Sequence, residues 1–344
     1  MTRICIVPVV DGLGGMASFR HKFEAGLETR GIEVTHNPAD PSEAVLVIAG
    51  TRNLFPLWRA RRRGTRIVQR LDGLNWIHRE RNTGLRHFMR AEYGNFVLSL
   101  IRSRIATNIL YQSEFSRRWW DDRYGKTPVL FSVVHNGVDL SEYRPHVQGV
   151  SPLDGERPHK PLRLLVVEGN LGGGYDMGLA NAVQLVEVLA ERYNLPMELM
   201  VVGKISAGHK AAVQAHARVP ILWAGLVPHE QIPEIDRSAH LLFSADLNPA
   251  CPNSVIEALA CGLPVVAFDT GAMNELILGD SGRLVPYGGD PWKLDQPDIP
   301  ALAGAAAEIL KDRQRFSAAA RIQAEAALSL DKMMDGYLKT LLED

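Results

Sequence analysis

The strongest constraint on the fold of this chain is an alternation of short apolar runs with longer segments of helical pattern. Each apolar run is bounded by turn residues, as buried strands are. Strands that alternate with helices in this way predict a parallel sheet covered by helices. The predicted strands are 3–9, 44–50, 66–71, 108–113 and 129–134 in a first series, and 162–169, 197–203, 219–225, 240–246, 264–270 and 282–286 in a second.

A proline-rich, weakly apolar segment at 142–161 separates the two series and predicts a linker. The length of 344 residues also exceeds what a single hydrophobic core usually supports. We therefore expect an α/β protein of two doubly wound, Rossmann-like domains, 1–150 and 151–325, that face each other across a cleft. The alanine-rich tail, 301–343, is expected to be helical and to pack on the second domain, with a last helix, 326–344, able to reach back to the first.

The formal net charge of −1 conceals an uneven distribution of charge. Residues 1–150 contain 22 Lys and Arg against 14 Asp and Glu, whereas residues 151–344 contain 16 against 25. The basic runs 58–66 and 78–90 either face an anionic lipid surface or an anionic acceptor, or they form an ordinary solvated surface. Nucleic acid is a poor candidate, because no nucleic-acid reading motif accompanies these runs.

The chain has three cysteines, Cys5, Cys251 and Cys261. Their odd number argues against a disulfide framework, and their spacing does not match that of zinc ligands. We expect no secretory leader at the amino terminus, and no run of about 18 apolar residues is present to span a bilayer. The expected compartment is the reducing cytoplasm, with peripheral contact at the inner membrane face left open.

The segment CPNSVIEALACGLPVV (251–266) places one carboxylate, that of Glu257, in the first turns of a short alanine-rich helix. Ser254 and Glu257 have the S-x-x-E spacing of a capping box, in which the glutamate binds the backbone N–H of Ser254. Alternatively, the N–H groups at this helix N-terminus bind an anion, and Glu257 accepts hydrogen bonds from a vicinal diol. Gly262 and Pro264 account for the end of the helix in either case.

This segment and its continuation, PNSVIEALACGLPVVAFDTGAMNEL (252–276), resemble the donor-binding segment of family-4 retaining glycosyltransferases with the GT-B fold. Three other stretches match that family in the same order: 11–34, 113–120 with 133–145, and 164–170. Together they cover nearly the whole chain. The resemblance implies a metal-independent glycosyltransferase that moves a sugar from a UDP- or GDP-linked donor to a glycan, lipid-linked or small-molecule acceptor. It implies no cofactor beyond this nucleotide-sugar co-substrate.

The resemblance also assigns roles to residues of the second domain. The carboxylate of Glu257 would hold the ribose hydroxyls of the donor. The backbone amides of Asn253, Ser254 and Val255 would approach its diphosphate.

In the first domain, the resemblance puts the amides of Gly15 and Met16 under the donor phosphate or the acceptor. Ala17 stands where a dinucleotide-binding fingerprint has its third glycine, which disfavours a dinucleotide site. Asp72 follows the predicted strand 66–71, where many relatives have a histidine that touches the transferred sugar. It either caps the next helix or accepts a hydrogen bond from that sugar.

The sequence departs from the family pattern at the diphosphate. Pro249 replaces a first acid, and Asn170 and Tyr175 stand where an arginine and a lysine are usual. Leaving-group charge still needs stabilisation. The candidates are an amide nest at Gly172, Gly173 and Gly174 and the ammonium of Lys204, while Asp246 or Asn248 could replace the lost acid.

Two rival functions therefore stay open. A catalytically silent GT-B protein that binds or scaffolds a partner is favoured by the missing cations and the missing acid. A nucleotide-sugar epimerase is less favoured, because no carboxylate and histidine set for proton abstraction is evident in the sequence.

Overall fold

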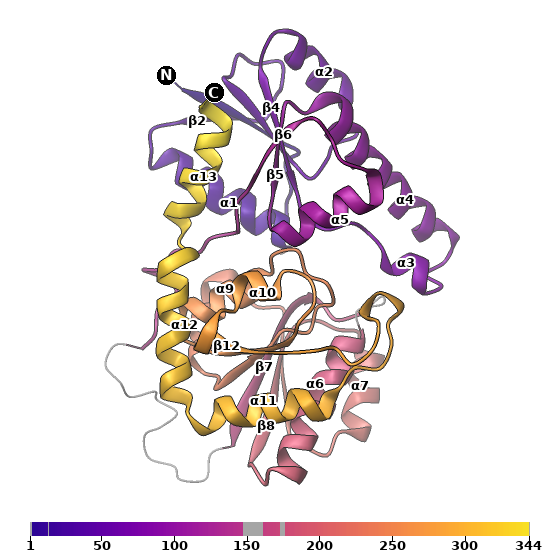
Figure 1. The fold of residues 1–344 in the computed structure, drawn as a ribbon, viewed down its shortest axis with the longest axis vertical. Helices are drawn as coiled ribbons and strands as arrows, with labels where there is room; N and C mark the ends of the chain where they lie inside the picture. Colours follow the sequence, from indigo (N-terminus) through magenta and orange to yellow (C-terminus); the bar gives the residue numbers. More distant parts are fainter. Residues whose placement is uncertain (1, 13, 147–160, 173–175, 344) are drawn as a thin grey trace. The chain divides into compact units, whose positions relative to one another are not determined.

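A computed structural model describes residues 2–12, 14–146, 161–172 and 176–343, which divide into two compact units (Figure 1). The first unit comprises Met1–Gly137 and Leu330–Asp344, and the second comprises Val138–Ser329. Each unit is built on a six-stranded sheet whose strands are all parallel. The chain therefore has the expected two-domain α/β architecture of the GT-B fold.

The sheet of the first unit has the strand order β2-β1-β3-β4-β5-β6. Its strands are β1 (Arg3–Val7), β2 (Glu33–Thr35), β3 (Ala44–Ile48), β4 (Arg66–Leu71), β5 (Asn108–Tyr111) and β6 (Leu130–Val133). The helices of this unit are α1 (Gly15–Glu28), α2 (Leu54–Arg62), α3 (Ile77–Glu80), α4 (Leu85–Leu100), the π-helix η1 (Ile101–Ile105), α5 (Glu114–Tyr124) and α13 (Leu330–Leu342).

Helices cover both faces of this sheet, which is why central strands such as β3, with the sequence AVLVI, are apolar throughout and buried. Helices α1 and α13 pack on one face through a core that includes Phe23 and Tyr337. On the other face, α2, α4 and η1 share a second core through Leu57, Val97 and Ile101.

The sheet of the second unit has the order β12-β11-β10-β7-β8-β9. Its strands are β7 (Leu162–Asn170), β8 (Met197–Lys204), β9 (Ile221–Gly225), β10 (Leu241–Phe243), β11 (Val265–Phe268) and β12 (Gly282–Val285). The α-helices are α6 (Asp176–Arg192), α7 (Ala207–His216), α8 (Ile232–Arg237), α9 (Asn253–Ala260), α10 (Met273–Leu276), α11 (Ile299–Lys311) and α12 (Arg313–Ala327). Short 3₁₀ turns lie at η2 (His229–Gln231), η3 (Gly279–Ser281) and η4 (Pro291–Lys293).

Alternate residues of each strand in this sheet enter different cores, as the period of two requires. Leu164 of β7 joins the core formed with α6 and α11, and its neighbour Leu165 joins the core formed with α8, α9 and α12. The helix boundaries follow local signals: Asp298 caps α11 by accepting a hydrogen bond from the Ala301 N–H, and α9 ends before Gly262, whose φ is 72°.

The chain passes between the units at residues 137/138 and 329/330, whereas the sequence placed the boundaries at 150/151 and 325/326. The reason is burial: Val138 and Tyr143 are in the core of the second unit, as is Leu328 near the other end. Val138 also forms a parallel bridge with Ser329, which ties both crossing points to the second unit. Most of the expected linker, 147–160, lies outside the described residues.

Candidate functional site

The carboxyl ends of β7, β8 and β10 gather polar side chains at one edge of the second sheet. These strands are neighbours in the order β10-β7-β8, so the residues that follow them meet at the edge where ligands bind in sheets of this type. Asn170 ends β7, Lys204 ends β8, and Asp246 follows β10. The structure thus brings these three predicted residues to the same edge.

Asn170 and Lys204 are register partners in adjacent strands. Both are exposed, and the backbone of Lys204 accepts a hydrogen bond from the Leu171 N–H at 2.9 Å. The side-chain amide of Asn170 donates to the carbonyl of Gly172 at 3.3 Å. Gly172 is therefore held in a local turn beside the strand end, while the rest of the expected amide nest, Gly173 and Gly174, lies outside the described residues together with Tyr175.

Glu168 and Asp246 form a pair of acids at this edge. Burial and then the negative charge of Asp246 raise the pKa of the Glu168 carboxyl well above its usual range. Burial also raises the pKa of Asp246 to about 6, and the N–H of Leu247 opposes this shift. Two interacting carboxyl groups of this kind resist simultaneous ionisation, so one of them can donate a hydrogen bond while the other accepts one.

Helix α9 begins at Asn253, with Pro252 at the N-cap position and no side-chain cap. The capping-box interpretation is therefore wrong, because Ser254 is the second residue of the helix and not its cap. The first intrahelical hydrogen bond runs from the Ile256 N–H to the Pro252 carbonyl at 3.4 Å. The amides of Asn253, Ser254 and Val255 precede it, so all three belong to the helix N-terminus where anions bind.

The carboxylate of Glu257 is buried, with 7% of its side chain exposed, and it faces the half-exposed ring of His229. The His229 Nε2 lies 3.1 Å from the Glu257 Oε1. The same imidazole ring lies 3.2 Å from the Tyr143 hydroxyl and packs against the tyrosine ring edge. His229 thus contacts the Glu257 carboxylate directly, so a ligand that binds this carboxylate must share or replace the histidine contact.

A second buried acid, Asp236 of α8, lies near Glu257. Asp236 is 1% exposed, and neither carboxyl oxygen has a hydrogen-bond partner among the described residues. Burial raises the pKa of Asp236 well above its usual range, and the charge of Glu257 adds to this rise.

Three residues near the site, Glu168, His229 and Asp236, were not among the candidates predicted from the sequence. The position of Glu168 could have identified it as a site residue, because it is an acid directly after the buried part of a strand. No local sequence pattern marks His229 or Asp236 as a site residue. They approach Glu257 only because α8 packs against both η2 and α9.

In the first unit, Gly15 and Met16 are the first two residues of α1, directly after the loop that follows β1. The first intrahelical hydrogen bond there runs from the Ser18 N–H to the Gly14 carbonyl at 3.0 Å, so the amides of Gly15 and Met16 also precede it. Met16 is 40% exposed. The structure therefore presents both predicted amides at a helix N-terminus.

Asp72 lies at the carboxyl end of β4, half-buried, and its carbonyl accepts a hydrogen bond from the Trp120 Nε1 at 2.8 Å. Burial raises the pKa of the Asp72 carboxyl, and the nearby charge of Arg70 partly offsets this. The next helix, α3, is capped by Trp76 without a side-chain hydrogen bond, so Asp72 does not occupy its N-cap position. Its carboxyl group thus follows a strand end in the first sheet, as Asp246 does in the second.

The loop after β10 contains the two alternatives for the lost acid. Asn248 is 5% exposed, has a positive φ of 54°, and its Nδ2 has no hydrogen-bond partner in the described part of the chain. Pro249 is buried, and a side chain at Gly271 would collide with it. The loop is therefore closely packed at the position where the family pattern has an acid.

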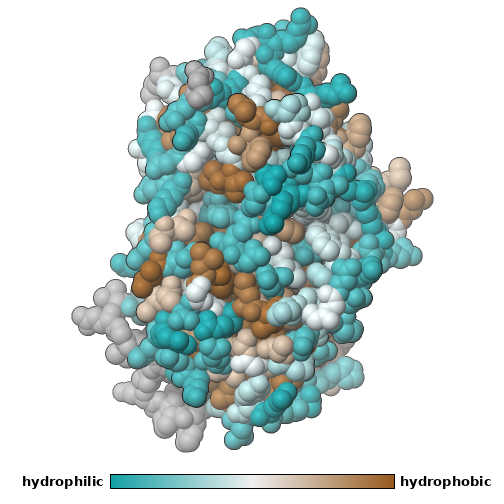
Figure 2. Space-filling view, viewed as in Figure 1, coloured by the Kyte–Doolittle hydropathy of each residue, from teal (hydrophilic) through white to brown (hydrophobic). Residues whose placement is uncertain are grey.

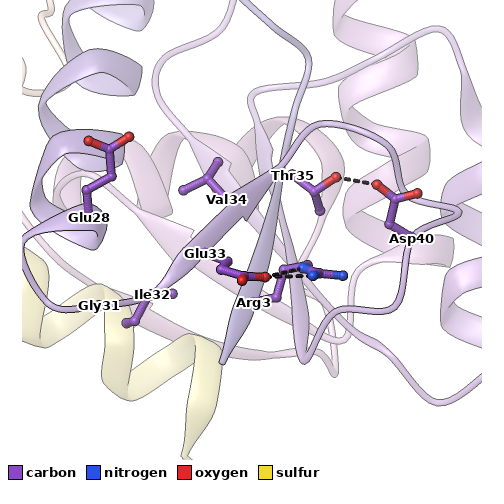
Figure 3. A pocket seen from close by; sticks show the side chains of 8 residues that line it. All are labelled: Arg3, Glu28, Gly31, Ile32, Glu33, Val34, Thr35 and Asp40. Atoms are coloured by element: carbon purple, nitrogen blue, oxygen red, sulfur yellow. Dashed lines mark hydrogen bonds and ion pairs between the residues drawn. The ribbon is translucent and has the colours of Figure 1, made fainter. Parts of the chain in front are cut away.

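Two surface hollows that described residues line contain none of the candidate residues named above. The first, of about 580 Å³, adjoins β2 in the first unit; among its lining residues Arg3 contacts Glu33 at 2.6 Å, and Thr35 donates to Asp40 (Figure 3). The second, of about 530 Å³, lies at the α3–α4 junction.

Within residues 2–12, 14–146, 161–172 and 176–343, no three His, Cys, Asp or Glu side chains are grouped so as to hold a metal ion. No described helix is both long enough and apolar enough to cross a bilayer. All three cysteines are buried as free thiols.

Residues 164–312 match the family described as glycosyl transferases group 1. The lipopolysaccharide core biosynthesis mannosyltransferase LpsB of Rhizobium meliloti is 29% identical over 206 residues, which are 55% of this chain and 53% of that protein. The chain thus spans about half the length of that relative.

Solved structures resemble the whole chain in fold. Sucrose-phosphate synthase of Thermosynechococcus elongatus has a TM-score of 0.73 at 15% identity, over 98% of this chain and 97% of that one. The Anabaena protein HepE, in complex with UDP-glucose, has a TM-score of 0.70 at 14% identity, over 99% of each chain.

Proposed function

The chain belongs with the family-4-like glycosyltransferases of GT-B fold, and from that premise we propose that it moves a sugar from a nucleoside-diphosphate sugar to an acceptor. The observation that carries the proposal is the start of α9, where three backbone amides lie ahead of the first intrahelical bond and a carboxylate follows within one turn. Amides at a helix N-terminus suit a diphosphate, and a carboxylate suits the diol of a ribose. A relative named as a mannosyltransferase and a neighbour solved with UDP-glucose support the same substrate class.

In this proposal the donor is a UDP- or GDP-linked sugar held by the second unit. Glu257 accepts hydrogen bonds from the ribose hydroxyls after His229 moves aside. Lys204 contributes the positive charge that Asn170 and Tyr175 no longer supply. The acids Glu168 and Asp246 share one proton, so they hold the transferred sugar or a phosphate oxygen without presenting two negative charges to it.

The reaction proposed is metal-independent and retains the anomeric configuration. The departing phosphate oxygen takes the acceptor proton, so no side-chain base is needed. Asp72 accepts a hydrogen bond from a sugar hydroxyl, and the amides of Gly15 and Met16 approach the donor phosphate or the acceptor. The acceptor, a glycan, a lipid-linked molecule or a small molecule, binds the basic first unit, and the protein acts in the cytoplasm.

The test is calorimetric titration of UDP and GDP into the wild type and Glu257→Ala. Hydrogen bonds to a charged group contribute about 1.5–3 kcal/mol each, so loss of this carboxylate is expected to weaken nucleotide binding by about tenfold to a hundredfold. Glu234→Ala, which removes an acid of α8 whose side chain is 67% exposed, is the matched control. Unchanged affinity in a folded Glu257→Ala protein would remove the ribose role.

The variant His229→Ala tests whether Glu257 binds a ribose or is only a buried acid that stabilises the fold. If the ribose replaces the histidine contact, the variant is expected to bind nucleotide at least as tightly as the wild type. A parallel loss in both variants would instead mean that the His229–Glu257 contact is needed only for the local fold.

Asn170 and Tyr175 stand where the family usually has an arginine and a lysine. This difference favours one rival, a catalytically silent GT-B protein that binds a partner. Incubation with a panel of nucleotide sugars distinguishes the two. Sugar transfer or slow donor hydrolysis supports the enzyme, and neither across the panel supports the rival. Formation of an epimer without acceptor would point to a nucleotide-sugar epimerase.

A further inference from the structure

Helix α4 (Leu85–Leu100) has an apolar stripe on its solvent side. Leu85, Met89, Tyr93 and Phe96 are 79%, 61%, 50% and 59% exposed, and Phe88 beside them is 38% exposed. Their spacing of three and four residues places them on one face of the helix. The opposite side of α4 is the one that packs inward, through Ala91, Asn95 and Val97.

Helix α2 (Leu54–Arg62) exposes aromatic rings of the same kind. Phe55 is 63% exposed and Trp58 is 43% exposed. The guanidinium of Arg59 lies 5.8 Å from the Phe55 ring centre, and that of Arg62 lies 4.9 Å from the Trp58 ring centre. Each exposed ring on α2 is thus paired with an arginine.

The two helices are neighbours on the same side of the first unit. Their inner faces share one core, in which Leu57 of α2 packs with Val97 of α4. The Arg52 guanidinium, just before α2, lies 5.7 Å from the ring centre of Tyr93 on α4. Figure 2 shows apolar residues protruding at the margin of the molecule over the junction of α3 and α4. We call the exposed side chains of α2 and α4, with Arg52, Arg86 and Arg90, the aromatic–arginine surface.

The charge of this surface favours an anionic occupant. Residues 52–63 contain five arginines, Arg52, Arg59, Arg61, Arg62 and Arg63, and no acidic residue. Arg86 and Arg90 flank the stripe of α4, whose one acid, Glu92, is already bound by His78 and Arg79 at 2.7 Å. A second copy of this chain would bring like charges together, whereas anionic lipid headgroups would neutralise them.

We propose that the aromatic–arginine surface docks the protein on an anionic lipid bilayer. Two neighbouring helices that expose rings and aliphatic side chains beside arginines have the composition of interfacial helices, whose apolar side chains enter the headgroup boundary. The arginines add electrostatic attraction to anionic lipid. Apolar exposure on this scale without a partner is unusual for a monomeric soluble surface. The inference is independent of the proposed transfer reaction, because it concerns only where the first unit binds.

The test is flotation of the full chain with vesicles of phosphatidylcholine alone and of an equimolar mixture of phosphatidylcholine and phosphatidylglycerol. Binding is expected only to the mixed vesicles, and it is expected to weaken as salt is raised. The variants Arg62→Glu and Phe96→Ser are each expected to reduce partitioning by about tenfold. The matched controls are Lys126→Glu, at another exposed cation of the first unit, and Ile322→Ser, at a 64% exposed apolar side chain of α12. Both controls should bind as the wild type does.

Three results would overturn the proposal. The first is equal binding to neutral and anionic vesicles. The second is a loss that is the same in the controls as in Arg62→Glu and Phe96→Ser. The third is self-association of the wild type in sedimentation, abolished by Phe96→Ser, with no vesicle binding. Thermal unfolding of each variant verifies that it is folded, and the salt dependence of the wild type tests the electrostatic part without any variant.

Discussion

At the scale of single residues, Asp236 is a carboxyl group whose protonated form is favoured by the fold. It is 1% exposed and has no hydrogen-bond partner among the described residues, and burial and Glu257 both raise its pKa. The folded chain therefore binds this proton more tightly than the unfolded chain. As pH rises above about 4, the unfolded aspartate ionises first, and the free energy of unfolding falls until the pH passes the folded pKa.

Asp236→Asn is expected to remove this pH-dependent loss of stability. At neutral pH the variant should gain about 1–3 kcal/mol in free energy of unfolding, because the amide cannot ionise in a buried site. The gain should disappear below about pH 3, where the aspartate is largely protonated in both states. Chemical denaturation at both pH values measures it, with Asp331→Asn, at an exposed acid of α13, as the control. A gain of the same size at both pH values would contradict the argument.

The sequence was sufficient to select Glu257 but not its surroundings. Glu257 could be predicted because its pattern is local: an acid one turn into a helix, after a strand and before a glycine, all within one short segment. The contact between Glu257 and His229 joins residues 28 positions apart, and it exists only because η2 precedes a helix that packs on α9. The stripe on α4 was missed for a different reason: its spacing equals that of a buried helix face, and only the structure shows that it is turned outward.

At the scale of elements, all the predicted strands exist and lie within a few residues of their expected bounds, because a strand buried on both faces is apolar throughout. The 240–246 segment shows the limit of this reasoning. Only Leu241–Phe243 pairs as β10, and the remainder of the segment, through Asp246, lies beyond the end of the strand. The apolar run in the sequence extends past the end of β10 because Ala245, beyond the strand, packs against helix α6.

That packing gives a prediction about α6 (Asp176–Arg192). A Cβ at Gly178 would lie 2.4 Å from the Ala245 carbonyl oxygen, whereas a Cβ at Gly208 of α7 would meet nothing within 4 Å. Gly178→Ala is expected to lower the free energy of unfolding by about 1–3 kcal/mol, because the backbone at Ala245 or at Gly178 must move to make room for the new methyl group. Gly208→Ala should raise it by about 0.5–1 kcal/mol, because alanine is the better helix former.

Denaturant unfolding of both variants measures these changes. Since Ala245 adjoins Asp246, Gly178→Ala should also weaken nucleotide binding, whereas Gly208→Ala should leave it unchanged. Equal stability changes in the two variants would show that α6 can move away from β10 at no cost.

At the scale of the whole molecule, the last helix of the chain belongs to the first unit. Met333, Met334, Tyr337 and Leu341 of α13 are buried in the core that holds Phe23 of α1 and Leu46 of β3. The Tyr337 hydroxyl also accepts a hydrogen bond from Arg70 Nε of β4 at 2.9 Å. Residues at the two ends of the sequence thus form one core, which no local pattern at 326–344 specifies.

This division predicts that core substitutions act on one unit at a time. Met334→Ala should lower the stability of the first unit by about 2–5 kcal/mol, the usual effect of truncating a buried methionine. Hydrogen exchange should then accelerate in β3 (Ala44–Ile48) and remain unchanged in β10 (Leu241–Phe243). Leu302→Ala, in the α11 core of the second unit, is the mirror control and should accelerate exchange in β10 alone. If Met334→Ala accelerates exchange equally in both strands, the two units unfold as one body and α13 stabilises the whole chain.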